Sequence, residues 1–178
     1  VKAEDVTLIT GTFAEVNAAL VTNALTLLTA DNVAATLSGT VLAANANTIA
    51  NATEGKVTAT ITAADANTLA TTLGGAAPTD ALNITVNGTN AAALNLTTLY
   101  GKTSLKITVD AAKVTGLFAD LKDIYVTNKS KFTALGNENA SITPVAPATS
   151  ISASDVNSIA KVTSGAVTAT VSSGTAKD

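Results

Sequence analysis

Residues 56–70 read Lys-Val-Thr-Ala-Thr-Ile-Thr-Ala-Ala-Asp-Ala-Asn-Thr-Leu-Ala, and this stretch decides the fold. Its first part alternates apolar residues with threonine, which is the pattern of a β-strand with one buried face. In its second part Thr62 precedes Asp65 by three residues, an arrangement that starts a helix, because the hydroxyl accepts a free backbone N–H and the acid favours the positive end of the helix dipole. The stretch therefore predicts a strand, a tight turn and a short helix.

The helical phrase recurs along the chain. Copies lie at 42–50, 62–70 and 152–160, and a more diverged copy lies at 12–20. Four strand-like pieces place Val33, Val57, Leu82 and Leu105 at successive steps of 24, 25 and 23 residues. Repetition on this scale predicts a stacked array in which each unit buries its apolar face against the next.

The same patterns give the expected elements. Strands are predicted at 6–9, 33–37, 56–61, 81–86, 104–109, 123–127 and 166–171, with an additional strand at 141–143. Helices are predicted to begin at the pairs Thr12 with Glu15, Thr62 with Asp65 and Ser152 with Asp155, and a further helix is predicted over 110–117 with Asp110 as its cap. Glycines are expected where a helix stops and the next strand begins, at Gly39, Gly55, Gly74, Gly75, Gly101 and Gly165.

Strands joined by a helix must run parallel, with a right-handed crossover. The predicted fold class is therefore α/β, a β-α repeat solenoid with one parallel sheet and short helices on the opposite side. An all-β sandwich or a β-helix stays open as the alternative. The residues expected to face one continuous core are Val57, Ala59, Ile61, Leu82, Ile84, Val86, Leu105, Ile107, Val109, Val167, Ala169 and Val171, with Leu69, Ile159 and Leu117 packing onto them from helices.

Three regions are expected along the chain. Residues 1–136 form a repeat array with a more globular coil at about 100–132, which holds four of the five aromatic residues. Residues 137–150 form a strand and a proline-containing connector, and residues 151–178 form the final repeat unit. The chain holds no methionine, so we expect it to be a segment of a larger protein.

Composition excludes several function classes. The absence of cysteine and histidine removes thiolate and imidazole chemistry, including the commonest soft metal ligands. Ten basic against 13 acidic residues and 3% aromatic residues argue against nucleic-acid binding. The longest apolar stretch, 16–30, is interrupted by Asn17 and Asn23 and is shorter than the roughly 20 residues of a membrane-spanning helix.

The segments 10–20 and 135–139, together with the copies of Ala-Asp-Ala-Asn-Thr-Leu-Ala, resemble the tandem repeats of very large bacterial surface proteins. These are the Ala/Thr-rich secreted adhesins and surface-layer proteins of cyanobacteria and marine bacteria, many of which leave the cell by type I secretion. The resemblance implies an extracellular module at the cell surface. The Gly-Gly-x-Gly-x-Asp nonapeptides that bind calcium in many such proteins are absent, so neither calcium dependence nor a secretion signal is carried over.

The expected function is therefore that of a non-catalytic structural module, a surface-layer or adhesin segment that self-associates, contacts neighbouring repeats or acts as a stalk. The alternative is a binding module for glycan or ice through a threonine-rich sheet face. Its outward strand positions would be Thr58, Thr60, Thr85, Thr108, Thr168 and Thr170, interrupted by Asn83 and Lys106. Ordinary β-propensity explains exposed threonine more simply.

No residue is assigned to catalysis, to a cofactor or to a metal. The repeated asparagines Asn17, Asn47, Asn67 and Asn157 are expected to be buried and to satisfy turn backbone groups, in preference to forming a ligand ladder. The carboxylates Asp65, Asp80, Asp120 and Asp123 are scattered, which argues against an acid/base pair. An oxygen-only calcium site stays open at Asp110, Asp120 and Asp123, although their spacing fits no known calcium loop. Six Asn-x-Ser/Thr triplets, interpreted as coincidence, begin at Asn51, Asn83, Asn87, Asn95, Asn128 and Asn139.

Overall fold

The computed structural model describes residues 6–23 and 32–173. The end of the apolar stretch 16–30 and the last five residues of the predicted final unit lie outside these residues. The strands are β1 (Leu8–Gly11), β2 (Ala34–Val41), β3 (Val57–Ile61), β4 (Ala81–Asn83), β5 (Thr85–Val86), β6 (Ala91–Ala92), β7 (Ile107–Val109), β8 (Lys113–Leu117), β9 (Phe132–Thr133), β10 (Asn139–Thr143) and β11 (Val167–Thr168). The helices are α1 (Phe13–Asn17), α3 (Ala43–Ala50), α4 (Ala66–Thr72), α5 (Ala93–Tyr100), α6 (Phe118–Lys122) and α7 (Ala153–Ala160), with the π-helices η1 (Ala18–Thr22) and η2 (Asp123–Thr127) and the 3₁₀-helix η3 (Lys129–Lys131).

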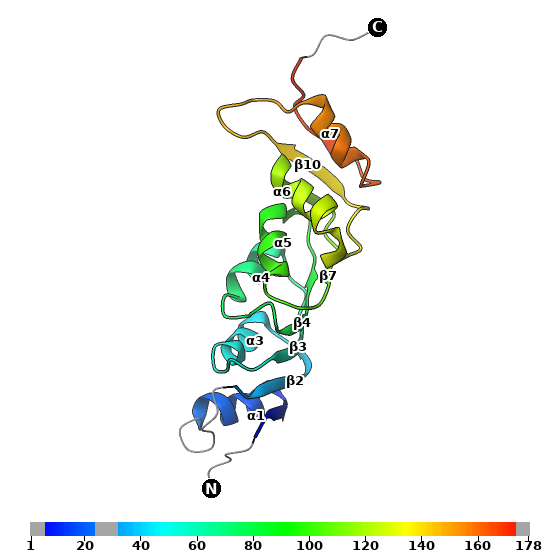
Figure 1. The fold of residues 1–178 in the computed structure, drawn as a ribbon. Helices are drawn as coiled ribbons and strands as arrows, with labels where there is room; N and C mark the ends of the chain where they lie inside the picture. Colours follow the sequence, from blue (N-terminus) through cyan, green and yellow to red (C-terminus); the bar gives the residue numbers. More distant parts are fainter. Residues whose placement is uncertain (1–5, 24–31, 174–178) are drawn as a thin grey trace.

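The strands form three sheets with the orders β1-β2-β3-β4, β5-β7-β9 and β11-β10-β8-β6, and every pair in them is parallel. Figure 1 shows the units following one another along the long axis, with α3, α4 and α5 on one side and β2, β3, β4 and β7 on the other. The fold is α/β with parallel sheets. An all-β sandwich or β-helix is wrong, because helices connect the strands.

Two predicted elements have the opposite type. Residues 113–117 form strand β8 instead of a helix, and residues 123–127 form helix η2 instead of a strand. Lys-Val-Thr-Gly-Leu has Val114 as its one buried residue and pairs with both β6 and β10. Ile124 and Tyr125 are neighbours in the chain and are both buried, which a strand with one buried face does not allow.

An internal duplication accounts for both differences. Residues 10–23 and 115–128 are identical at seven of 14 positions, sharing Thr-Gly-x-Phe-Ala and Val-Thr-Asn, and residues 42–61 and 152–171 are identical at ten of 20. In both copies a strand leads through an α-helix into a π-helix. Parallel strands pair at the same offset, with Thr10 opposite Thr36 and Thr115 opposite Ser141. We call 10–61 the first copy and 115–171 the second copy.

Helix starts follow the prediction in part. Thr12 and Glu15 form the predicted capping box, and Ser152 accepts a hydrogen bond from the Asp155 backbone N–H at 3.1 Å. At α4 the cap is Asp65 itself, whose carboxylate accepts the Thr68 N–H at 2.9 Å. The predicted cap Thr62 is wrong, because its hydroxyl donates to the carbonyl of Val41 in the preceding unit.

The predicted core is largely confirmed. The residues that are buried as predicted are Val57, Ala59, Ile61, Leu82, Ile84, Val86, Ile107, Val109, Leu69 and Ile159. Leu105 is 43% exposed because β7 begins only at Ile107, and Leu117 is 36% exposed at the start of α6. In the last described unit Val171 is exposed and Val167 and Ala169 are half-buried, because no described strand covers β11 on its far side.

Two glycine positions follow from close packing of successive units. A Cβ at Gly55 would collide with the backbone at Val33, and a Cβ at Gly165 would collide with the backbone at Glu138. Both glycines lie between a helix and the next strand, as predicted. Gly39 does not end a helix; it lies within β2 with φ +74°, where the register with β3 shifts.

Candidate functional site

The repeated asparagines do not form the predicted buried series. Asn67 and Asn157 are exposed on α4 and α7, and Asn17 is half-buried. Only Asn47 bonds the backbone of the next unit, since its side-chain oxygen accepts the Gly75 N–H at 2.7 Å. The burial predicted for Asn67 and Asn157 is wrong, because both side chains project from the solvent side of their helices.

Threonines occupy the role predicted for asparagine. In both copies a threonine after the helix, Thr53 or Thr163, accepts the N–H of the glycine two residues later at 2.9 and 3.1 Å. Its hydroxyl donates to a carbonyl of the preceding unit, Val33 at 2.6 Å and Glu138 at 2.8 Å. Thr103 bonds the preceding unit in the same way. The sequence signal is a threonine four residues before the first residue of the strand, as in Thr-Glu-Gly-Lys-Val and Thr-Ser-Gly-Ala-Val.

Two buried carboxylates close the loops between units. Asp80 is 3% exposed and accepts the N–H of Val57 at 2.7 Å and of Ala77 at 2.8 Å. Glu138 is 7% exposed and accepts the N–H of Gly136 at 3.0 Å, the N–H of Asn137 at 3.1 Å and the Tyr125 hydroxyl. Both carboxylates accept backbone N–H groups of the loops, so their arrangement holds backbone in place.

Burial and the neighbouring Glu138 carboxylate raise the pKa of Tyr125 far above its ordinary value. The same causes, burial first and then Asp123, raise the pKa of Tyr100. Asp123 accepts the hydroxyls of Thr97 at 3.0 Å and Tyr100 at 3.1 Å and the amide of Asn128 at 2.7 Å. The Asp123 network joins α5 to η2. Because both pKa values are raised, both tyrosines stay protonated at neutral pH and donate hydrogen bonds, Tyr100 to Asp123 and Tyr125 to Glu138.

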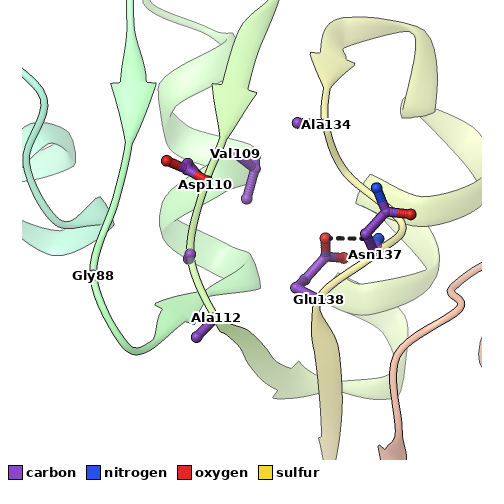
Figure 2. A pocket seen from close by; sticks show the side chains of 8 residues that line it. Gly88, Val109, Asp110, Ala112, Ala134, Asn137 and Glu138 are labelled. Carbon is purple, nitrogen blue, oxygen red and sulfur yellow. Dashed lines mark hydrogen bonds between the residues drawn. The ribbon is translucent and has the colours of Figure 1, made fainter.

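The carboxylates considered for calcium do not converge. Among the described residues no group of three or more acidic side chains could hold a metal ion. Asp110 is exposed and lines a hollow of about 460 Å³ with Gly88, Ala134 and Glu138. Figure 2 shows the Glu138 carboxylate turned towards the backbone at Asn137, whose N–H it accepts, and so it is not free to act as a calcium ligand. The hollow therefore offers one solvated carboxylate.

The outward threonines form rows across the sheets. One row runs Thr10, Thr36 and Thr58, and another runs Thr85, Thr108 and Thr133, where the last two hydroxyls lie 3.0 Å apart. Thr168 continues a third row, which begins Thr115 and Ser141. Thr60 is exposed as predicted and lies opposite Asn83, which interrupts its row. Thr170 is exposed but lies outside the strands. Parallel pairing thus places hydroxyls opposite one another in successive strands.

The asparagines of the six triplets differ in exposure. Asn51, Asn83 and Asn139 are exposed, whereas Asn87, Asn95 and Asn128 are half-buried. Asn139 accepts the Ala166 N–H at 2.9 Å, and Asn128 belongs to the Asp123 network. Two of the six side chains therefore have a structural partner.

Comparison of the chain with known protein families, with curated proteins and with solved structures found no match. In the described part of the chain no helix is both long and apolar enough to cross a membrane.

Proposed function

We propose that the chain is a non-catalytic structural module of a secreted bacterial cell-surface protein, a surface-layer or adhesin segment that self-associates or serves as a stalk. The observation that carries the proposal is parallel pairing throughout the described strands, with β1 bonded only to β2 and β11 only to β10 at the two ends. Such edges offer unpaired backbone groups to another strand.

The architecture behind this proposal is a β-α solenoid. Hydrogen bonds between adjacent units support it, because they join residues 20 to 28 positions apart, from Thr53 with Val33 to Gly75 with Asn47. In a solenoid each unit contacts mainly its neighbours, so length is added without a change of cross-section. That property suits a stalk or a lattice element.

Charge favours association of unlike ends. Residues 1–99 hold two lysines against seven acidic residues, whereas residues 100–178 hold eight lysines against six. Because their net charges are opposite, the acidic half of one molecule attracts the basic half of another molecule. Head-to-tail contacts of this kind generate open filaments where the rotation does not close.

Light scattering across a range of protein and salt concentrations tests the proposal. We expect association that grows with protein concentration and weakens with salt. Leu8→Lys adds a charge to the β1 edge, where Leu8 is 54% exposed, and should reduce association. Leu105→Lys, at a 43% exposed site within the array, is the matched control. A protein that stays monomeric at high concentration and binds glycan or ice would overturn the self-association proposal.

The second candidate function is glycan or ice binding through the threonine rows. The observation that favours it is the register, which sets Thr85, Thr108 and Thr133 side by side on three parallel strands. Thr108→Lys should abolish inhibition of ice recrystallisation or glycan retention if this face binds. An unchanged activity in that variant would exclude the face.

A further inference from the structure

A groove of about 670 Å³ lies between two neighbouring helical segments, α6 with η2 and α7. Figure 1 places α6 and α7 at the end of the molecule beside β10. Lys122 and Val126 are four residues apart on the first segment, and Ser154, Asn157 and Lys161 follow at helical spacing on the second. Side chains at these spacings lie on one face of a helix, so the groove is lined by one stripe from each segment.

The groove is cationic. Lys122 and Lys161 both line it, no carboxylate is in its described lining, and both lysines are exposed. Asp123, next to Lys122 in the chain, is occupied by Thr97, Tyr100 and Asn128. Two ammonium groups without an acidic partner in the lining form a site for an anion, in a chain whose net charge is −3.

The first copy provides a built-in comparison. By the alignment of the two copies, Asn17 stands at the position of Lys122 and Asn51 at that of Lys161, whereas Val21 matches Val126 and Asn47 matches Asn157. Asn47 is occupied by the Gly75 N–H, and Asn51 fills the space beside Gly75. The second copy thus differs from the first in carrying two lysines along this helix pair and an exposed amide at Asn157.

We propose that this groove binds an anionic polysaccharide, with Lys122 and Lys161 pairing to a carboxylate or sulfate of the sugar. Sugar hydroxyls both donate and accept, as do the Ser154 hydroxyl and the Asn157 amide, and the 49% exposed Val126 offers an apolar surface to a sugar ring. The volume lies within the range of small-ligand sites. The proposal does not depend on self-association or on the threonine rows.

Calorimetric titration of the intact chain with trigalacturonate tests the site, with neutral galactotriose and a short polyglutamate as comparison probes. We expect trigalacturonate to bind, galactotriose to bind far more weakly, and added salt to lower the affinity. Dilute protein, kept below the concentration at which it associates, separates this result from the assembly experiment. No binding of trigalacturonate, or equal binding of galactotriose, would overturn the proposal.

Lys122→Asn and Lys161→Asn introduce the residues of the first copy. Each should weaken binding about three- to fivefold, and the double variant by more than about tenfold, with an unchanged melting temperature because both side chains are exposed. Lys106→Asn, an exposed lysine outside the groove, should leave the affinity unchanged. Asn157→Ala should weaken the binding of trigalacturonate more than the binding of polyglutamate. Unchanged affinity of the double variant for trigalacturonate would contradict the proposed site. A sugar site would also be contradicted if polyglutamate bound as tightly as trigalacturonate and Asn157→Ala weakened both equally.

Discussion

Over the residues that the structure describes in both, the first and second copies share a series of elements and differ in the side chains inside it; the second copy also has η3 and β9 between η2 and β10. Both contain a strand, an α-helix that continues as a π-helix, a second strand, an eight-residue helix and a third strand. Both keep the threonine and glycine that fasten the third strand to the unit before, at Thr53 with Gly55 and Thr163 with Gly165. These shared residues contact backbone, and therefore the course of the chain depends on them.

The residues that differ between the copies include a pair of interior positions. Leu20 and Val33 of the first copy are both buried, and Tyr125 and Glu138 stand at their positions in the second copy as a hydrogen-bonded pair. The second copy also has an insertion between β10 and α7, where the first has the Gly39 bulge. The same scaffold thus holds two apolar residues at these positions in one copy and a hydrogen-bonded polar pair in the other.

The largest effect is expected from Ile107→Asp, in β7 between the two copies. Ile107 is fully buried, and an unpaired carboxylate there should cost more than about 4 kcal/mol and unfold the chain. Thermal melting followed by circular dichroism measures the loss, with Leu105→Asp at an exposed site as the control. Two separate transitions, one per copy, would show that the copies fold independently.

Gly55→Ala and Gly165→Ala test whether the copies are held by the same close approach. Each added Cβ collides with backbone of the preceding unit, so we expect a loss of about 3 kcal/mol for each variant. Gly74→Ala is the control, because a Cβ there would lie 4.0 Å from its nearest neighbour. Denaturant unfolding gives the three values, and a neutral Gly55→Ala would contradict the packing between the first units.

The pair Tyr125 and Glu138 can be converted to the residues of the first copy. Glu138→Val alone strands the Tyr125 hydroxyl and two loop N–H groups and should cost about 2 kcal/mol. Adding Tyr125→Leu should recover part of that loss, since the apolar pair exists in the first copy. A double-mutant cycle in urea measures the coupling. Strictly additive losses would show that the two positions are independent.

The same tyrosine makes the second copy sensitive to alkali. The pKa of Tyr125 is raised in the folded chain, so above pH about 10 the unfolded chain loses this proton while the folded chain keeps it. Stability contributed by the protonated tyrosine is therefore complete below pH 10 and falls as pH rises beyond it. Melting temperatures across this range should fall more steeply for the parent than for Tyr125→Phe, and parallel curves would refute the assignment.

The smallest effect is expected from Asn67→Ala. The sequence alone predicts a loss of about 1–3 kcal/mol from a buried asparagine, but the exposed position reduces our expectation to less than about 0.5 kcal/mol. Thr163→Val, which removes the hydroxyl that joins Gly165 to Glu138, should cost about 2 kcal/mol. The difference between the two melting temperatures decides which residue type fastens the units.

The sequence predicts the central strands of the first sheet well and the short elements at 110–127 poorly. Alternation at 56–61 locates β3 and its buried residues because burial of one strand face is a local pattern. The same reasoning misplaces 110–117 and 123–127, where short elements of both types fit the local composition. Comparison of 10–23 with 115–128 would have resolved both, since the capping box at Thr12 and Glu15 locates the helix in the first copy.

The candidate site was less predictable than the fold. The sequence shows which residues recur, but not whether a recurring side chain reaches its neighbour in space. Asn47, Asn67 and Asn157 occupy the same place in their phrases, and only Asn47 bonds the next unit. The groove between α6 and α7 combines residues from two separate segments, 122–126 and 154–162, so no single sequence motif contains it.

The sequence alone was enough for the alternation of strands with short helices and for the apolar face of each central strand, because these depend on spacings of two to four residues. It was also enough for the parallel direction of the strands, because a helix joins one strand to the next. The tertiary structure was needed to show that Thr53, Asp80 and Thr163 join successive units and that Lys122 lies across a groove from Lys161. Contacts between residues 20 or more positions apart depend on the register in which units stack, and that register is set by packing of the whole array.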